Sequence, residues 1–210
     1  MPLQNDVVIG DLRPEERSSA VDIFADAFLD FPLLQVMAGT DVSARGRLRR
    51  MFAMQFEPDA HIHALAARAD GRLVGALTYV DSPDCSAMSA GRMVRFARIA
   101  GPRIFHTMRL FMRVERVHPQ TAHRHLPTVG VLPPFHSQGI GRRLMEVFGR
   151  RCDEEGRIAY LETIRWADPE RPSHERFYTR LGYAIADVVP MTDAWQVLTM
   201  VRQPGASSES

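Results

Sequence analysis

The sequence predicts a single α/β domain built around a mixed β-sheet. Its 210 residues are 45% hydrophobic and 24% charged, which is typical of a soluble globular protein rather than a disordered one. Strand-like segments alternate with helical ones in the order β-α-α-β-β-α-β-α-β-α-β-β. This alternation, without an internal repeat or a long linker, indicates one α/β domain over residues 1–203. Residues 204–210, PGASSES, are expected to form a disordered tail.

Local signals place the elements of the N-terminal half. Arg13-Pro14-Glu15-Glu16 opens a helix, because proline and acidic residues suit the first turn. Asp70-Gly71 is a type I′ turn signal and predicts a hairpin. The expected order is a strand at 6–11, a helix from residue 13 to Phe31-Pro32, a helix at 43–56, strands at 61–68 and 72–80, and a helical segment at 91–117 broken at Gly101-Pro102.

The C-terminal half is read in the same way. Leu144, Phe148 and Cys152 share one face of a helix, and Gly182 is suited to the residue after a helix end. The expected order is a loop at 118–127, a strand at 127–132, a turn at 133–138, a helix at 140–155, a strand at 158–163, a short helix at 173–181 and strands at 183–189 and 194–201.

Composition excludes several classes of function. All 26 basic residues are arginine, so a Walker-A loop and a Schiff-base lysine are excluded, since both need lysine. A net charge of +1 gives no case for binding nucleic acid or a membrane surface. No apolar run approaches the roughly 20 residues of a membrane span, and no secretory signal is recognisable. Cys85 and Cys152 are too few for a disulfide framework, which favours the cytoplasm.

The most informative stretch is Val129–Arg143, where a strand enters a glycine-bearing turn that opens a helix. Unpaired N–H groups at a helix N-terminus bind anions, and Gly139 and Gly141 let a ligand approach the backbone. Arg142 and Arg143 oppose the helix dipole by about 0.3–1 kcal/mol each, a placement that an anion would explain. The alternative is a tight turn followed by two solvated arginines.

The stretch His136-Ser137-Gln138-Gly139-Ile140-Gly141 resembles motif A of the GNAT superfamily, Gln/Arg-x-x-Gly-x-Gly/Ala, with His136 at the Gln/Arg position. Residues 160–163 (YLET) and 177–183 (FYTRLGY) are similar to a further family segment. The second of these is especially similar to the puromycin N-acetyltransferase type. The family's second-motif asparagine has no clear match here.

The resemblance implies a GNAT fold, with a mixed central sheet of about seven strands flanked by helices. It implies acetyl-CoA as co-substrate and no metal. By position, the pantetheine arm would bind the main chain of Val129, Gly130 and Val131. The pyrophosphate would bind the loop residues, which are His136, Ser137, Gln138, Gly139, Ile140, Gly141 and Arg142. A primary amine of a small molecule would attack the thioester directly, in a ternary complex.

Two catalytic candidates follow from the same resemblance and from burial. Tyr178 matches the family tyrosine near the CoA sulfur and is the candidate general acid; the alternative is an ordinary amphipathic tyrosine. Phe177 and Leu181 are expected to face the core, leaving Tyr178 turned differently. Glu162 lies in an apolar strand, where a raised pKa would suit a general base. Its alternative is a strand-end carboxylate reaching solvent or an arginine.

The acceptor pocket is expected between residues 24–36 and 91–125, with His118, His123 and His125 as candidate lining residues. A zinc site is not expected there, because nearby cysteines and a clear fourth ligand are absent. The sequence leaves the oligomeric state open, including a homodimer.

Three other functions stay open. A non-catalytic acyl-CoA sensor would keep the anion site, and a peptide N-terminal acetyltransferase would differ only in its acceptor. A serine hydrolase would use Ser137, since residues 135–139 look like a nucleophile elbow in which Phe135 replaces the first glycine. Only His174, after Asp168, lies downstream to complete its triad.

Overall fold

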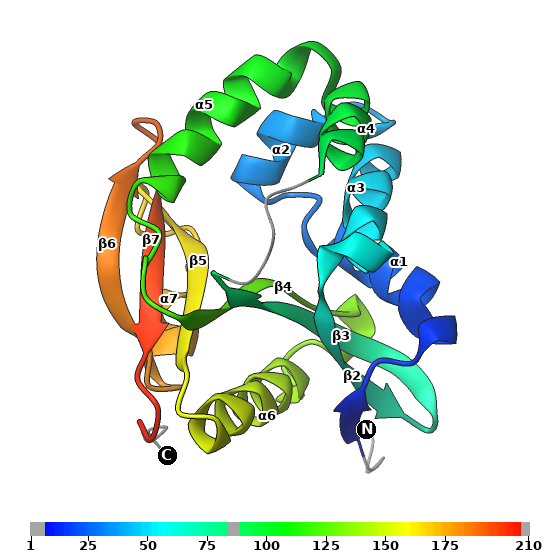
Figure 1. Ribbon diagram of the computed structural model, residues 1–210, viewed down its shortest axis with the longest axis vertical. Helices are drawn as coiled ribbons and strands as arrows, with labels where there is room; N and C mark the ends of the chain where they lie inside the picture. The colour runs from blue at the N-terminus through cyan, green and yellow to red at the C-terminus, as the bar shows by residue number, and fades with distance from the viewer. Residues whose placement is uncertain (1–6, 84–88, 207–210) are drawn as a thin grey trace.

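The chain folds into a seven-stranded mixed sheet with helices on both faces, as the sequence predicts (Figure 1). The computed structural model describes residues 7–83 and 89–206. The strands are Val8–Asp11 (β1), His63–Ala69 (β2), Arg72–Ser82 (β3), His123–Val131 (β4), Ile158–Trp166 (β5), Ala184–Pro190 (β6) and Trp195–Arg202 (β7). Their order in the sheet is β1-β2-β3-β4-β5-β7-β6, and only β4 and β5 pair in parallel.

Seven α-helices are described along these residues. They are Arg17–Ala27 (α1), Pro32–Ala38 (α2), Ala44–Ala53 (α3), Ala90–Ala100 (α4), Ile104–Glu115 (α5), Ile140–Glu154 (α6) and Glu175–Thr179 (α7). Short 3-10 turns are described at Pro14–Glu16, Met54–Phe56, Pro58–Ala60, Gly101–Arg103 and Pro133–Phe135. None of the described helices is long and apolar enough to cross a membrane.

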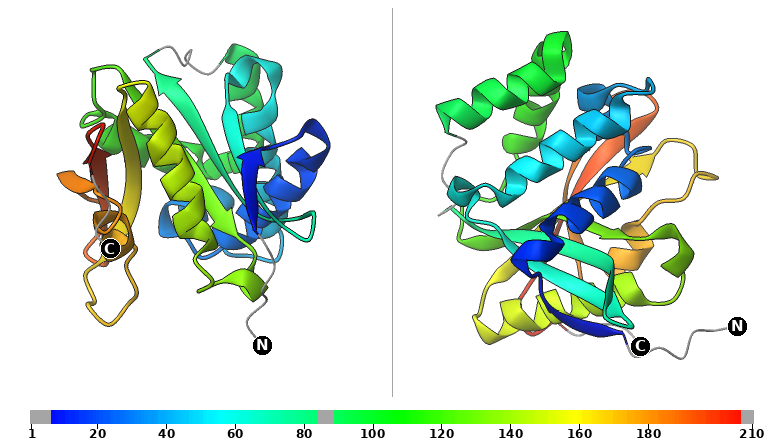
Figure 2. Two further views of the ribbon diagram at one scale, coloured as in Figure 1. Left: turned by 90° about the horizontal axis from the view of Figure 1, so that it is seen from below. Right: turned by 90° about the vertical axis from the view of Figure 1, so that its right-hand side faces the viewer.

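Helix α6 covers one face of the sheet with the apolar stripe that its sequence predicts. Leu144, Phe148 and Cys152 are fully buried there. Seen from below (Figure 2, left), α6 lies across the junction of β4 and β5. Helices α1 and α3 cover the opposite face, with Phe24 in their core. A Cβ at Gly130 would lie 3.3 Å from the Phe24 ring, so the missing side chain lets α1 pack closely on β4.

Strands β4 and β5 diverge part of the way along their length. They pair only where His123–Leu126 lies beside Ile158–Leu161. Pro127 lies within β4, directly after the segment paired with β5, and has no N–H to donate to a neighbour. Beyond this point one edge of β4 faces away from β3 with no strand beside it. The divergence (Figure 1) opens the sheet toward the helices above it.

Helices α4 and α5 span the opening between the two halves of the sheet. Phe96 of α4 packs with Met37 and Met54 on the α2–α3 side. Leu110 and Val114 of α5 pack with residues of β5, β6 and β7. In Figure 1 the two helices form the upper edge of the molecule.

The structure differs from several predicted boundaries. Pro32 does not only end the first helical region but also begins α2, because proline fits the first position of a helix. The loop expected at 118–127 is strand from His123 onward, where pairing with β3 and β5 outweighs its polar sequence. Strand β5 continues to Trp166 along β7. The helix expected at 173–181 spans only Glu175–Thr179.

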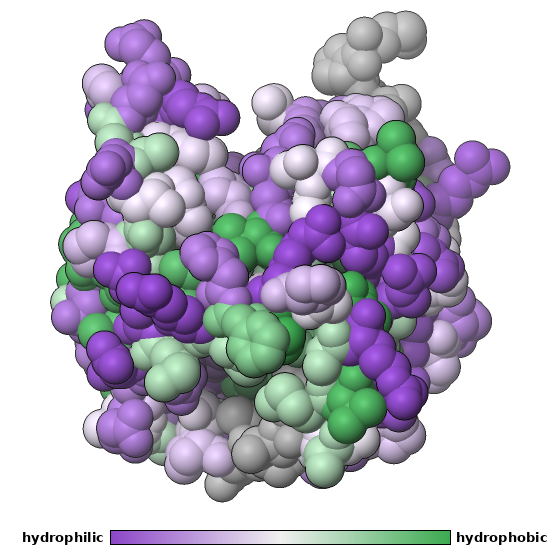
Figure 3. Space-filling model, turned by 90° about the horizontal axis from the view of Figure 1, so that it is seen from above, coloured by the Kyte–Doolittle hydropathy of each residue, from purple (hydrophilic) through white to green (hydrophobic). Residues whose placement is uncertain are grey.

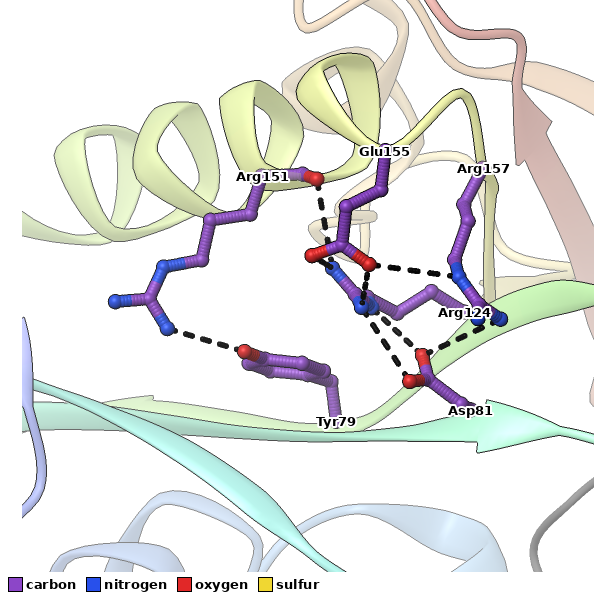
Figure 4. A network of polar contacts seen from close by, with 6 residues as sticks. All are labelled: Tyr79, Asp81, Arg124, Arg151, Glu155 and Arg157. Carbon is purple, nitrogen blue, oxygen red and sulfur yellow. Dashed lines mark hydrogen bonds and ion pairs between the residues drawn. The ribbon is translucent and has the colours of Figure 1, made fainter.

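Arg124 explains how a charged residue can lie inside β4. Its side chain, on the α6 side of the sheet, is 4% exposed and binds Asp81 of β3 and Glu155 at the end of α6, at 2.8 and 2.7 Å (Figure 4). Arg157 contacts the same two carboxylates. The buried cation is therefore paired, which a charge in a sheet interior requires.

Part of the predicted C-terminal tail and one of the two cysteines lie within the described residues. Residues 204–206 of the predicted tail are described, and the Gly205 N–H donates to Asp153 at 2.7 Å. Residues 207–210 and Cys85 lie outside the described residues. Burial raises the pKa of Cys152 to about 11, so this thiol is unreactive in the folded protein.

Candidate active site

A cavity of about 1360 Å³ lies between the diverging strands and the helices above them. It exceeds the roughly 300–1,000 Å³ of a typical small-ligand pocket, so it has room for two substrates. Both segments expected to shape the acceptor pocket line it, with residues such as Phe28 and Leu34 from the first and Phe96 and His118 from the second. The cavity also reaches the loop between β4 and α6.

The loop before α6 forms a concave row of unpaired backbone N–H groups. Ser137 and Gly139 have positive φ angles of 59° and 76°. Among the described residues, the six consecutive N–H groups of 137–142 have no hydrogen-bond acceptor. The first helical bond is from Arg143 N–H to the Gly139 carbonyl, at 3.0 Å. Such rows of N–H groups, at the positive end of a helix dipole, bind phosphate-like anions.

Only one of the two loop glycines is required by the backbone. A Cβ at Gly139 would meet nothing within 4 Å, so its φ of 76°, and not a lack of space, favours glycine there. A Cβ at Gly141 would make only ordinary contacts, 3.9 Å from Phe177 and Val131. Ser137 also has a left-handed backbone although it is not glycine. A positive φ in a residue with a side chain is uncommon and is often found at functional sites.

The polar side chains of this loop already have protein partners. His136 Nε2 donates to the Val131 carbonyl at 2.8 Å, and Gln138 Nε2 donates to the Pro134 carbonyl at 3.0 Å. Arg142 pairs with Glu146 one turn further along α6, at 2.8 Å, and Arg143 donates to the Val7 carbonyl. The two arginines are thus accommodated without an anion, and the backbone N–H groups are the unpaired donors.

The main chain of β4 leads from the sheet to this loop. Val129, Gly130 and Val131 pair with β3 on one side, opposite Leu77, Ala76 and Gly75. All three line the cavity. Their other edge lies beyond the paired part of β5, so it can pair with an extended, peptide-like ligand.

Tyr178 lies on α7, and its side chain lines the same cavity. Phe177 and Leu181 pack on the core as expected, but Tyr178 does not turn away from them and belongs to the same buried cluster. Within the described residues its hydroxyl makes no hydrogen bond. Burial raises the pKa of Tyr178 to about 12, which keeps the hydroxyl protonated at neutral pH.

Glu162 lies at the point where β4 and β5 diverge, and it is not an isolated carboxylate. Its Oε2 accepts a hydrogen bond from His125 Nε2 at 2.7 Å, and its Oε1 is 3.8 Å from His118 Nδ1. Burial favours the protonated form, but the interactions with His125, His118 and Tyr160 outweigh it. The pKa of Glu162 is therefore lowered, and the raised value expected for a base is wrong.

The histidines form a chain whose hydrogens can be assigned from their partners. His123 Nδ1 donates to the Thr121 carbonyl at 2.8 Å, so its Nε2 must accept the bond from His118 Nε2 at 3.1 Å. Burial lowers the pKa of His123, whereas contact with Glu162 raises that of His118. All three rings pack around Tyr160, whose buried hydroxyl interacts with the Glu162 carboxylate but makes no hydrogen bond of ordinary geometry among the described residues.

Sequence reasoning did not anticipate the contact between His125 and Glu162. Alternation along the strands could have found it, because His123 and His125 on β4 and Tyr160 and Glu162 on β5 share one face. No group of His, Cys, Asp and Glu among the described residues could hold a metal ion. Nor does any hydrogen bond within residues 7–83 and 89–206 join Ser137 to His174, as a hydrolase triad would need.

A diverging parallel strand pair followed by a row of unpaired N–H groups is the arrangement expected from the resemblance to acyl-CoA-dependent transferases. A family model for the acetyltransferase (GNAT) domain matches residues 60–185. The match covers more than half of the chain, which belongs to the GNAT acetyltransferase family. The protein is therefore a GNAT-type N-acetyltransferase, and members of this family use acetyl-CoA.

Solved structures agree on the fold. A protein from Corynebacterium glutamicum ATCC 13032, described as histone acetyltransferase HPA2 and related acetyltransferase, has a TM-score of 0.70 and 20% identity, covering 96% of this chain and 98% of that one. An agmatine N-acetyltransferase has a TM-score of 0.61 and 18% identity, with coverage of 95% and 100%. An aminoglycoside 6′-N-acetyltransferase bound to coenzyme A has a TM-score of 0.56 and 15% identity, covering 93% of this chain and 96% of that one.

Proposed function

We propose that this protein transfers an acetyl group from acetyl-CoA to a primary amine of a small molecule, by direct attack in a ternary complex. The observation that carries the proposal is the row of six unpaired N–H groups at 137–142, directly after the unpaired edge of β4. The N–H groups would hold the pyrophosphate, and the main chain of Val129–Val131 would hold the pantetheine arm. Both ligand parts match the donors available there.

The chemical step needs an acceptor for the amine's proton and a donor for the departing sulfur. The amine nitrogen bonds to the thioester carbonyl carbon, and the carbon–sulfur bond breaks. Tyr178, protonated at neutral pH, donates to the departing thiolate as the general acid. Without a protein hydrogen bond of its own, the hydroxyl is available for this contact.

Glu162 and His125 together would take the proton of the amine. Because the ionised Glu162 accepts from His125 Nε2, the lone pair of the neutral imidazole lies on Nδ1. That nitrogen has no hydrogen-bond partner among the described residues. The carboxylate would orient the ring and stabilise the imidazolium, and its lowered pKa suits this role better than accepting the proton alone.

Two features of the proposal rest on the sequence. The segment at 177–183 is similar to the puromycin N-acetyltransferase type, a similarity that assigns no acceptor. The small number of cysteines favours a cytoplasmic setting. A non-catalytic acyl-CoA sensor is the second candidate, favoured by the engagement of His136 with Val131 rather than with open space. A peptide N-terminal acetyltransferase would share the whole cofactor site.

Calorimetric titration of acetyl-CoA and CoA into the purified protein tests the proposal. We expect micromolar binding that is lost in Gly139→Glu. Gly156→Glu is the matched control, since Gly156 also has a positive φ, 64°, and an open site for a side chain, but lies at the other end of α6. No binding to the wild type would contradict both the transferase and the sensor. Binding without turnover of any amine would favour the sensor.

A further inference from the structure

The helical wall of the cavity is almost entirely apolar. Its large side chains come from α1 to α5 and the turn after α3, and they include Phe28, Phe31, Met37, Met54, Phe96 and Phe111. Two of the polar residues between them have protein partners, although Arg92 Nε makes no hydrogen bond within the described residues. Gln55 bridges Thr128 and Thr78 at 3.0 and 3.1 Å, and Arg92 donates to the Met54 carbonyl and pairs with Glu57. This wall therefore offers a ligand contact area but few hydrogen bonds.

Charged residues line several parts of the cavity. Arg92 on the helical wall is paired with Glu57, and Arg180 follows α7. Arg142 lines the end near the loop before α6. The acidic residues that line the cavity are Glu162 on β5 and Glu115 at the end of α5. The part with the backbone N–H groups and Arg142 suits an anion, and the Glu162 carboxylate at the diverging strands suits an ammonium group.

From these two observations we propose that the acceptor is a primary amine attached to a bulky apolar body. The inference rests on the proposed function and specifies its substrate class. The amine would lie at Glu162 and His125, and the body would lie against the methionines and phenylalanines of the helical wall. A polyamine, an amino sugar or a peptide would bury polar groups that find no partner there, at a large cost in binding.

The shape of the wall suggests tolerance of different apolar bodies. Met37, Met51 and Met54 are grouped there with Phe96. Methionine is unbranched and polarisable, and it adapts to ligands of different shape. We therefore expect an increase in efficiency with apolar size rather than a single permitted structure.

The apolar lining also continues to the surface. Figure 3 looks down on the face of α4 and α5 and shows apolar side chains in its middle, with polar ones around them. Phe111 lines the cavity and is 36% exposed, so the apolar lining reaches the surface at α5. Phe111 therefore gives an entering amine an apolar contact at the edge of the cavity.

A series of straight-chain primary alkylamines tests the inference, because their amines have similar pKa values and differ in apolar length. With acetyl-CoA saturating, release of the CoA thiol gives kcat/KM for each amine. We expect kcat/KM to rise about fourfold per added methylene, the factor that corresponds to 0.8 kcal/mol of burial. Agmatine, spermidine, an aminoglycoside and a short peptide are the polar comparisons.

A pair of variants on one helix provides the control. Phe111→Ala removes a cavity wall residue and should lower kcat/KM for the long amines, mainly through KM, while leaving the shortest amine unchanged. Phe105→Ala removes an equally large side chain from α5 that is 83% exposed and does not line the cavity, and it should change neither.

The outcomes separate this inference from the proposed function. A flat alkylamine series, or higher kcat/KM for the polar amines, would overturn the apolar acceptor while leaving an acetyltransferase. Acetyl-CoA binding without turnover of any alkylamine would overturn it as well. If acetyl-CoA does not bind, the proposed function fails first. In that case octylamine and spermidine are each titrated into the protein directly. Equal affinity for the two amines would overturn the inference.

Discussion

Replacing Glu162 by glutamine tests the acid–base arrangement most sharply, because the side chain keeps its size and loses only its charge. The carboxylate holds His125 Nε2 at 2.7 Å and faces His118 Nδ1 at 3.8 Å. A hydrogen bond to a charged group contributes about 1.5–3 kcal/mol, and 1.4 kcal/mol corresponds to a factor of ten. If this bond stabilises the imidazolium in the transition state, kcat should fall by about 10- to 150-fold.

The assay is initial-rate thiol release with the best amine of the alkyl series. KM for acetyl-CoA should stay the same in Glu162→Gln, because the N–H groups at 137–142 do not involve this carboxylate. Glu154→Gln, at the exposed end of α6, is the matched control and should leave kcat unchanged. An unchanged kcat in Glu162→Gln, or an equal loss in Glu154→Gln, would refute the reasoning.

Three further predictions concern separate parts of the molecule. Tyr178→Phe keeps the buried ring but removes the general acid, so kcat should fall by about 100-fold or more with acetyl-CoA affinity intact; an unchanged kcat would remove Tyr178 from the mechanism. The lowered pKa of Glu162 stabilises the fold above pH 4.5 and loses this effect as pH falls, whereas the raised pKa of His118 stabilises it below pH 6.5 and loses this effect as pH rises. In urea unfolding, the joint contribution of Glu162 and His118 to the free energy of unfolding should therefore be greatest between pH 4.5 and 6.5. Glu162→Gln should weaken the pH dependence of this free energy on both sides of that range. Identical pH profiles for the wild type and the variant would contradict the pairing. Arg124→Met leaves Asp81 partly buried with only Arg157, 3.8 Å away, as a cationic neighbour, and should lower the free energy of unfolding by about 3 kcal/mol, partly restored by Asp81→Asn; an additive double mutant would show that Arg124 and Asp81 do not interact.

Much of the fold is readable from local patterns because those patterns determine local structure. The stripe of Leu144, Phe148 and Cys152 predicts which face of α6 is buried, and Asp70-Gly71 predicts the β2–β3 hairpin. Pro32 was ambiguous, since proline both ends one helix and begins another. The start of β4 was hidden because Arg124 and His123 are polar residues whose burial depends on partners distant in the sequence.

The candidate site, like the fold, has one part that the local sequence specifies and one part that it does not. The turn with the unpaired N–H groups at 137–142 is a continuous segment, so its glycines and its helix start are visible in the sequence. The contact between Glu162 and His125 depends on the register of two parallel strands, which no local pattern specifies. That register also explains the error in the expected pKa of Glu162, because an apolar strand alone suggests burial without a cationic neighbour. The apolar wall of the cavity is assembled from five helices and could not be recognised from any one of them.

Mass analysis of a complete reaction tests the central claim most directly. The protein, acetyl-CoA and an alkylamine are incubated together. Mass spectrometry then measures the amine, the CoA and the intact protein from the same reaction. The account predicts N-acetylated amine and free CoA in equal amounts, with no change in the mass of the protein, because the amine attacks the thioester directly. Free CoA without acetylated amine, or a protein heavier by one acetyl group during turnover, would contradict it.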